Sequence, residues 1–279
     1  MPLLTVAIAA GGFLAAPMAG NGAISAIMAR PTRLEVKYEA VAPVMLMGRQ
    51  KVASAALTAD FTATGYRIAA NGKAESLIDW ITGTPSFGIV STGLLTPLGL
   101  YPGRYDSFTR NGKKDRHVIV DFAPDDVAIS VSPKFGDWGF PQPTQDQKLE
   151  ASDPLTAIAE LTLRRRATPT NPCGGPMRIF DGRQRYDLVL TFAGRLNWKS
   201  GAYKGPAIKC SVEYVEIAGF KNKSAEQRAK DRGDLAWANL ILAELDNGAV
   251  TPPLKLEARL KSRGKMTIEA TKLRYGPTR

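Results

Sequence analysis

The sequence predicts a mainly β protein, built as one curved, mostly antiparallel sheet that rolls into an open barrel or spiral and carries one or two short helices. Two observations support this fold class. Asn-Gly or Asp-Gly dipeptides, which favour the two-residue turns of β-hairpins, recur at residues 71–72, 111–112, 181–182 and 247–248. Between these turns, apolar and polar residues alternate with the period of half-buried strands. A sheet of roughly 10 to 14 strands tends to curl. Two packed β-subdomains are the alternative architecture.

The individual strands are expected from this alternation. The first covers residues 33–38, where apolar side chains alternate with charged ones, and a second begins near residue 44. Later strands each place one apolar set on a single face: Val118, Val120 and Phe122; Val127, Ile129 and Val131; Tyr186, Leu188, Leu190 and Phe192; Ile208, Cys210, Val212 and Tyr214. The last pair, 254–260 and 266–275, turns at residues 263–264. The mixed composition of residues 76–103 predicts a helix followed by a strand.

Residues 153–166 predict a helix. Asp153 is a suitable N-cap, Pro154 suits the first helical position, and apolar residues follow at helical spacing. Arginines at 164–166 would complement the helix dipole in the last turn. We expect this helix to pack against or across the concave side of the sheet. The polar segment 221–234 contains the spacing of a capping box and predicts a short exposed helix or a loop.

The N-terminal segment predicts export. Residues 1–29 contain no charged side chain, residues 3–16 have the length and composition of a signal-peptide core, and residues 23–25 offer a small-x-small cleavage pattern. Residues 30–279 then form a single β-rich domain in the periplasm. No Lys or Arg precedes the apolar run, so an uncleaved N-terminal membrane anchor and a buried N-terminal segment remain alternatives. No later run approaches the roughly 20 apolar residues of a spanning helix, and the body of the protein is not expected to span a membrane.

The two cysteines, Cys173 and Cys210, are the only ones in the chain. An exported protein with two cysteines usually pairs them, whereas the cytosol keeps thiols reduced. We therefore expect a disulfide between Cys173 and Cys210, with two buried free thiols as the alternative.

The sequence contains no recognisable catalytic, cofactor-binding or metal-binding motif. The Gly-x-Ser-x-Gly elbow, the Walker A loop, the dinucleotide fingerprint and the EF-hand loop are all missing, and one histidine with two cysteines makes a zinc site improbable. The single histidine, His117, shares a strand face with Asp115 and Asp121, which would suit a general base. A solvated polar face explains the same pattern better. We assign no catalytic residue, no cofactor and no metal ligand, and the ligand-binding residues are not identified.

A formal net charge of +11 can attract polyanions, but a solvated basic exterior explains it better. Basic residues concentrate at three places in the sequence: Lys113, Lys114 and Arg116; Arg164, Arg165 and Arg166; Arg178, Arg183 and Arg185. Export argues against nucleic acid as the partner. An anionic component of the cell envelope is the expected partner if this charge has a role beyond solvation.

Five blocks of the sequence carry a family resemblance. They are LYPGRYDSF (100–108), KKDRHVIVDF (113–122), SDPLTAI (152–158), PCGGPMRIFDGRQRYDLVL (172–190) and CSVEYVEIAG (210–219). With these blocks the chain resembles the bacterial exported family called domain of unknown function 3108, over about residues 33–275. The resemblance implies an envelope location and a β-rich fold. It implies no activity and no catalytic residues.

These features together predict a non-enzymatic periplasmic protein that supports envelope integrity and binds a lipid, a lipoprotein or another hydrophobic envelope component in the concavity of the sheet. The binding role follows from fold-level analogy with periplasmic lipoprotein carriers. One alternative is an enzyme that modifies envelope glycans with carboxylates drawn from Asp115, Asp121, Asp125, Asp153 and Asp187. Another is a scaffold that docks a second envelope protein through an exposed apolar patch.

Overall fold

The computed structural model describes residues 32–44, 47–75, 85–110, 115–164, 167–222, 226–227, 235–262 and 264–278. Strands dominate this part of the chain, as the alternating sequence predicts. They are β1 (Thr32–Val44), β2 (Gly48–Phe61), β3 (Gly65–Ala74), β4 (Ser86–Thr96), β5 (Gly99–Arg110), β6 (Arg116–Phe122), β7 (Val127–Ser132), β8 (Gly175–Phe180), β9 (Arg185–Lys199), β10 (Lys204–Ala218), β11 (Leu235–Ala243), β12 (Pro253–Leu260) and β13 (Gly264–Pro277). The named helices are α3 (Gln145–Leu149), α4 (Pro154–Thr162) and the 3-10 turn η1 (Asp246–Gly248).

The strands form one 13-stranded sheet in the order β7-β6-β5-β4-β3-β2-β1-β13-β12-β11-β10-β9-β8. The chain runs outwards from β1 to the edge strand β7, and then inwards from the other edge strand, β8, to β13. The first and last strands therefore pair with each other near the middle of the sheet, in antiparallel register. The expected antiparallel sheet is confirmed. Because all the strands belong to one sheet, the alternative of two packed β-subdomains is wrong.

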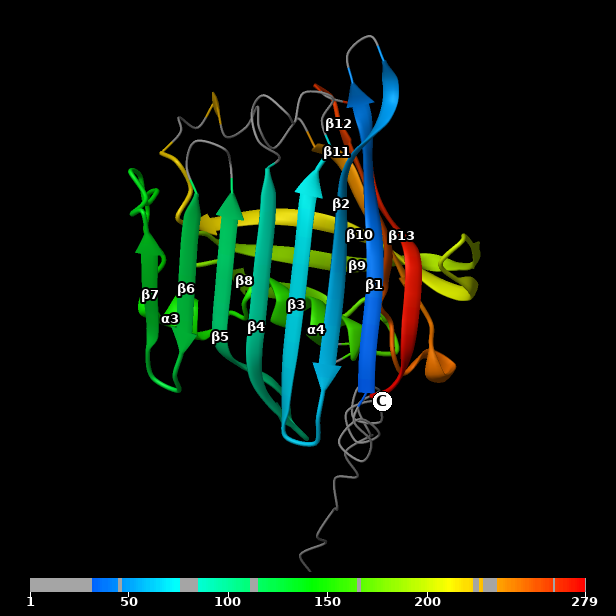
Figure 1. The fold of residues 1–279 in the computed structure, drawn as a ribbon, viewed down its shortest axis with the longest axis horizontal. Coiled ribbons are helices and arrows are strands. Elements are labelled where there is room, and N and C mark those ends of the chain that lie inside the picture. The colour runs from blue at the N-terminus through cyan, green and yellow to red at the C-terminus, as the bar shows by residue number, and fades with distance from the viewer. Residues whose placement is uncertain are drawn as a thin grey trace, which may run out of the picture.

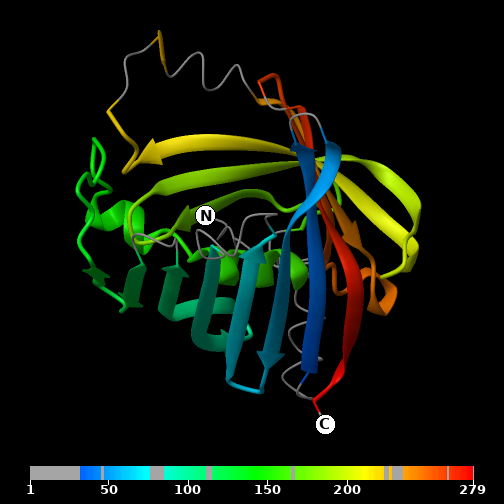
Figure 2. The same cartoon turned by 45° about the horizontal axis from the view of Figure 1, so that its top comes forward.

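The sheet curls so that its two ends face each other. In Figure 1, β8, β9 and β10 cross behind β3–β6, and Figure 2 shows α4 inside the curl, between the two layers. α4 packs against β3, β4, β5 and β8. One core cluster joins α4 to the inner faces of β1–β5, and a second joins it to β8–β11. The position predicted for this helix, on the concave side, is confirmed.

α4 begins as predicted and ends earlier than predicted. The Asp153 carboxylate accepts hydrogen bonds from the first helical turn, and Pro154 lies just inside it. The helix ends at Thr162, so the prediction of arginines in its last turn is wrong. Arg164 lies beyond the C-cap, has a φ of 53°, and its Nη1 donates to the Gly248 carbonyl at 2.6 Å. Arg164 therefore contacts the segment between β11 and β12 and does not complement the dipole of α4. Arg165 and Arg166 lie outside the described residues.

Two of the predicted turns occur where the dipeptides indicate. Residues 181–182 lie in the turn between β8 and β9, closed by a hydrogen bond from Asp181 N to Gln184 O of 3.2 Å. Residues 247–248 connect β11 to β12 through η1, and both have positive φ. Residues 111–112 and Arg263 lie outside the described residues. The second strand was expected from about residue 44, but β1 continues to Val44 and β2 begins at Gly48; residues 45–46 lie outside the described residues.

The predicted turn at residues 71–72 is wrong. Asn71 and Gly72 lie within β3 and pair with both β2 and β4. A Cβ added at Gly72 would lie 2.5 Å from the Phe87 ring. Glycine is therefore required here because an aromatic ring crosses the strand, and local turn chemistry did not indicate that contact.

The remaining differences concern helices. From residue 85 onwards, the segment expected as a helix and a strand forms the hairpin of β4 and β5, while residues 76–84 lie outside the described part. The short helix α3 was not predicted, although Thr144 and Gln147 form a complete capping box at its N-terminus. Residues 1–29 and most of 221–234 are also outside the described residues.

The β8–β9 turn contacts β6 across the curl at Gly182. A Cβ added there would lie 2.5 Å from Val118 Cγ1, and the Gly182 φ is +94°. We expect Gly182→Ala to lower the free energy of unfolding by about 2 kcal/mol, because left-handed backbone and overpacking both oppose the methyl group. Gly194 is a matched control, since its φ is +131° and a Cβ there would meet no described atom within 4 Å. Equal losses for Gly194→Ala and Gly182→Ala in urea denaturation would contradict the contact.

Candidate binding face on the concave side of the sheet

The inner face of the sheet carries a continuous row of apolar residues. Residues directly opposite each other on neighbouring strands project from the same face, so the pairing register follows the row from strand to strand. The row, called here the apolar row, runs from β9 to β3 through Phe192, Cys210, Leu240, Leu256, Ile268, Ala40, Ala53 and Ala74. It lies on the same face as Leu34 and Val36, which pack under α4.

Part of the apolar row is uncovered. Phe192 and Leu256 are each 38% exposed and Ile268 is 42% exposed, and Met266, on the inner face beside them, is 38% exposed. α4 packs mainly against β3–β5 and β8 and buries Cys210 of the row, but it leaves these four side chains partly exposed. The alanines that continue the apolar row across β1–β3 are small, so this part of the row is smooth. The concavity therefore presents an apolar surface to any molecule that enters it.

Aromatic side chains from β9, from β10 and from the residues after β10 border this surface on the side towards the edge strand β8. The rings of Tyr186 and Tyr214 lie 5.2 Å apart, and Phe220 meets Tyr214 edge-on at 6.2 Å. Burial raises the pKa of both tyrosines above the ordinary value for the residue. Both phenols are therefore neutral at physiological pH and add an amphipathic border to the apolar row.

A buried polar network fixes the N-terminus of α4 to the sheet. Asp153 Oδ1 accepts hydrogen bonds from the backbone N–H groups of Leu155 and Thr156, each at 3.0 Å, and from the Ser91 hydroxyl of β4. The Thr156 hydroxyl donates to Asp153 Oδ2 and lies 2.7 Å from the Tyr66 hydroxyl of β3. Burial raises the pKa of Asp153, against the opposing effect of these hydrogen bonds. Asp153 thus has a structural position, as the cap and anchor of α4.

The predicted disulfide between Cys173 and Cys210 is confirmed, with Cα atoms 6.0 Å apart. It joins the segment before β8 to the middle of β10. Both cysteines are buried against Ala157 and Leu161 of α4. The bond therefore fixes the segment before β8 to β10, next to α4.

The carboxylates considered for an enzyme lie on separate elements. Three of them form ion pairs: Asp121 with Arg104 at 2.6 Å, Asp115 with Arg110 at 3.5 Å, and Asp187 with Arg185. Asp125 is exposed between β6 and β7, and Asp153 is the buried cap of α4. His117 Nε2 lies 2.7 Å from Asp106 Oδ1 of the neighbouring strand. Their side chains are 42% and 39% exposed, as expected for a solvated polar pair.

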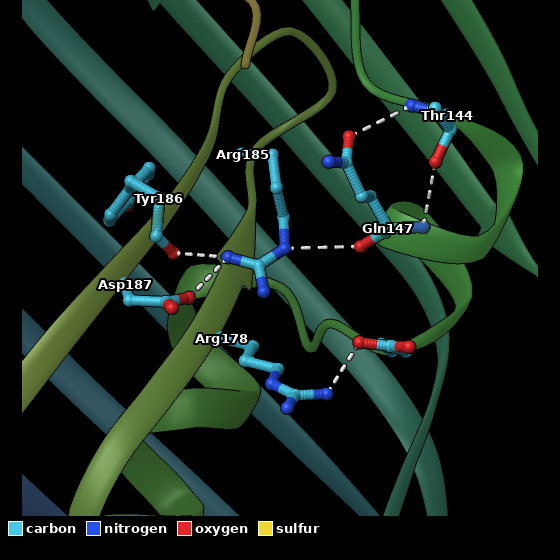
Figure 3. A network of polar contacts seen from close by, with 7 residues as sticks. Thr144, Gln147, Arg178, Arg185, Tyr186 and Asp187 are labelled. Carbon is cyan, nitrogen blue, oxygen red and sulfur yellow. Dashed lines mark hydrogen bonds and ion pairs between the residues drawn. The ribbon is translucent and has the colours of Figure 1, made fainter. Parts of the chain in front are cut away.

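All three arginines of the third basic concentration lie within ion-pair distance of a carboxylate. Arg185 is 4% exposed; its Nε donates to the Gln147 carbonyl at 3.1 Å, and its Nη1 contacts the Tyr186 carbonyl and Asp187. Arg178 pairs with Glu150. Figure 3 shows how these contacts attach α3 and the following residues to β8 and β9. Arg183 is not part of this network. Lys113 and Lys114 of the first concentration lie outside the described residues.

Among the residues in the described ranges, no group of three His, Cys, Asp or Glu side chains lies together in a way that could hold a metal ion. None of the helices in the same ranges is long and apolar enough to cross a membrane.

Comparison with known families matches residues 33–269 to the family described as "Protein of unknown function (DUF3108)". The chain belongs to this family. The DUF3108 match begins in β1 and ends in β13, the two strands that pair in the middle of the sheet. It therefore includes every strand that carries the apolar row. A comparison with curated proteins finds no match.

Sequence reasoning on this DUF3108 chain identified the apolar face of several single strands but missed the apolar row. Ile268 and Ala40 are adjacent in the sheet and far apart in the sequence. Neither Leu256 nor Ile268 differs in its local sequence pattern from other apolar strand residues. The only local signal for the row was the apolar alternation within β10, which places Cys210 beside Ile208 and Val212.

Proposed function

We propose that this protein is a non-enzymatic periplasmic binder of a lipid, an acylated lipoprotein or another hydrophobic envelope component, held on the concave face. The uncovered apolar row is the observation that carries the proposal. An apolar chain laid along it would remove Leu256, Ile268 and Phe192 from water. Each fully buried side chain of this size contributes about 1.5–3 kcal/mol.

The disulfide and the N-terminal sequence support the location. Disulfides persist in oxidising compartments such as the periplasm, and residues 1–29 have the composition of an export signal. Native mass spectrometry of protein purified from the periplasm, followed by organic extraction, tests the ligand directly. We expect a co-purifying lipid or acylated peptide. An unliganded mass in repeated preparations would contradict the proposal.

Leu256→Asn tests the position of the ligand. The substitution places a polar group in the centre of the apolar row, and we expect the protein to bind the fluorescent apolar probe N-phenyl-1-naphthylamine at least tenfold more weakly, since the contact of one leucine is lost. The measurement is a fluorescence titration of the folded variant.

Leu94→Asn is the matched control. Leu94 is 62% exposed and lines a different apolar recess of about 640 Å³, formed with Leu100, Tyr101, Phe122 and Leu149 at the ends of β4 and β5. We expect this variant to bind the probe as the wild type does. Loss of binding in Leu94→Asn with full binding in Leu256→Asn would place the ligand in the recess and overturn the proposed face.

A further inference from the structure

Two arginines from opposite ends of the curled sheet meet at one aromatic ring. Arg116 begins β6 on its inner face, and Arg183 lies in the β8–β9 turn. The Arg116 Cζ is 4.5 Å from the centroid of Phe135, and the Arg183 Cζ is 5.4 Å from it. Phe135 is itself held edge-on by Trp138, at 5.0 Å. These two residues, called here the arginine pair, therefore have their charges within about 10 Å of each other.

The arginine pair has unsatisfied hydrogen-bond donors. Arg116 Nε, Arg183 Nε and Arg183 Nη2 are buried without a hydrogen-bond partner among the described residues. Buried polar groups are almost always paired, and an exception calls for a specific explanation such as a missing ligand. An unpaired donor costs about 1–3 kcal/mol, and more when it is charged. The two guanidinium groups also repel each other at this separation, which is close to the screening length in physiological salt.

The nearby carboxylates do not satisfy these donors. Asp137 Oδ2 is 3.7 Å from Arg183 Nη2 and its side chain is 57% exposed. Asp181 Oδ1 accepts from the backbone N–H groups of Arg183 and Gln184, at 2.9 and 2.7 Å, so it is engaged within the turn. The ion pairs found among the described side chains include none for Arg116. The three donors therefore have no acceptor among the described residues.

The inner face leads from the apolar row to Arg116. A second row of directly opposed residues, next to the first, runs through Tyr38, Ala55, Gly72, Phe87, Thr109 and Arg116. From β6 to β2 it crosses four strand spacings, about 19 Å at the usual distance between strands. One leaflet of a bilayer holds acyl chains of about 15 Å. A single acyl chain with its headgroup at Arg116 would therefore cross about three of these spacings and reach β3, where Ala74 ends the apolar row.

We propose that Arg116 and Arg183 bind the anionic headgroup, a phosphate or a carboxylate, of an amphipathic ligand whose apolar chain lies along the concave face. This inference rests on the proposed function. Guanidinium groups suit both anions because their N–H donors match pairs of oxygens. The Phe135 ring stacks with the arginines and keeps them in place.

The test compares ligands that share one chain and differ in the headgroup. Palmitate, hexadecyl phosphate and hexadecanol each compete with N-phenyl-1-naphthylamine for the full-length mature protein, at a pH well above the carboxyl pKa. We expect the two anions to displace the probe at concentrations at least tenfold lower than the alcohol, since charged hydrogen bonds are formed only with the anions. A larger preference for the phosphate would indicate a phospholipid source, and a larger one for palmitate a fatty-acid source.

In the double variant Arg116→Gln/Arg183→Gln, we expect the two anions and hexadecanol to displace the probe at about the same concentration. The concentration of hexadecanol that is needed should not change. Arg104→Gln is the control, since it removes one positive charge from an exposed ion pair with Asp121 and should keep the preference. Equal displacement by anions and alcohol in the wild type would overturn the headgroup site while leaving the proposed function standing. If the double variant still prefers the anions to the alcohol, the headgroup site is likewise overturned and the proposed function stands. Failure of all three ligands and of the probe to bind would instead reject the proposed function.

Discussion

Replacing both cysteines with alanine is expected to lower the free energy of unfolding by about 4 kcal/mol. Cys173 and Cys210 are separated by 37 positions, and the loop-entropy relation gives this value for a cross-link of that length, on the view that the bond restricts the unfolded chain. The loss concentrates where the bond acts, at the junction of α4, β8 and β10. Guanidinium denaturation of Cys173→Ala/Cys210→Ala against the oxidised wild type measures it.

A reductant provides the control for the disulfide. With reductant in the denaturing solution, the midpoint of the wild type should fall towards that of the alanine variant, and the midpoint of the variant should not move. The sulfur atoms are buried, at 1% and 0% exposure, so the variant also loses some packing, but this loss is present with and without reductant. If the oxidised wild type and the variant unfold at the same midpoint, the bond does not stabilise the fold.

Local sequence signals predicted the elements of this fold whose causes are local. Alternating residues indicated the strands, Asp153 followed by Pro154 indicated the start of α4, and the pairing of Cys173 with Cys210 followed from their number and the signs of export. Each of these inferences depends on neighbouring residues or on composition. The curl of the sheet followed from the number of strands.

Features that depend on register were not predictable. The apolar row needs eight strands in the correct pairing, and irregularities between Ala40 and Val41 and between Lys209 and Cys210 shift that pairing by one residue. A shift of one residue exchanges the faces of a strand. The arginine pair also assembles from distant segments. The wrong turn at Asn71 has the same origin, because the ring that crosses Gly72 comes from a different strand.

Asp153→Ala is expected to lower the free energy of unfolding by about 3 kcal/mol. Loss of an N-cap costs about 1 kcal/mol. The substitution also leaves the buried Ser91 and Thr156 hydroxyls without their acceptor, at about 1–3 kcal/mol for an unsatisfied group. Asp153→Asn is the matched variant, since its Oδ1 still accepts from the backbone and its amide can donate to Thr156. We expect it to cost less than about 1 kcal/mol.

A comparison of the wild type with Asp153→Asn also shows the titration of Asp153. Burial raises its pKa in the folded state above the ordinary value of 3.8, so the folded protein holds this proton more tightly than the unfolded chain does. The stabilising contribution is complete below pH 3.8 and is lost as the pH rises through the folded pKa. Asparagine does not titrate. The stability of the wild type relative to Asp153→Asn should therefore fall between acidic and neutral pH.

Urea denaturation of the three proteins at several pH values separates the two roles of Asp153. A loss in Asp153→Ala that exceeds the loss in Asp153→Asn at every pH would reflect the hydrogen bonds that hold α4 to β4, because only alanine removes them. A pH-dependent difference between wild type and Asp153→Asn would reflect the cost of the buried charge. The wild type could instead become more stable relative to Asp153→Asn as the pH rises. The hydrogen bonds from Ser91, Thr156 and the backbone would then outweigh burial, and the pKa of Asp153 would be lowered, against the expectation.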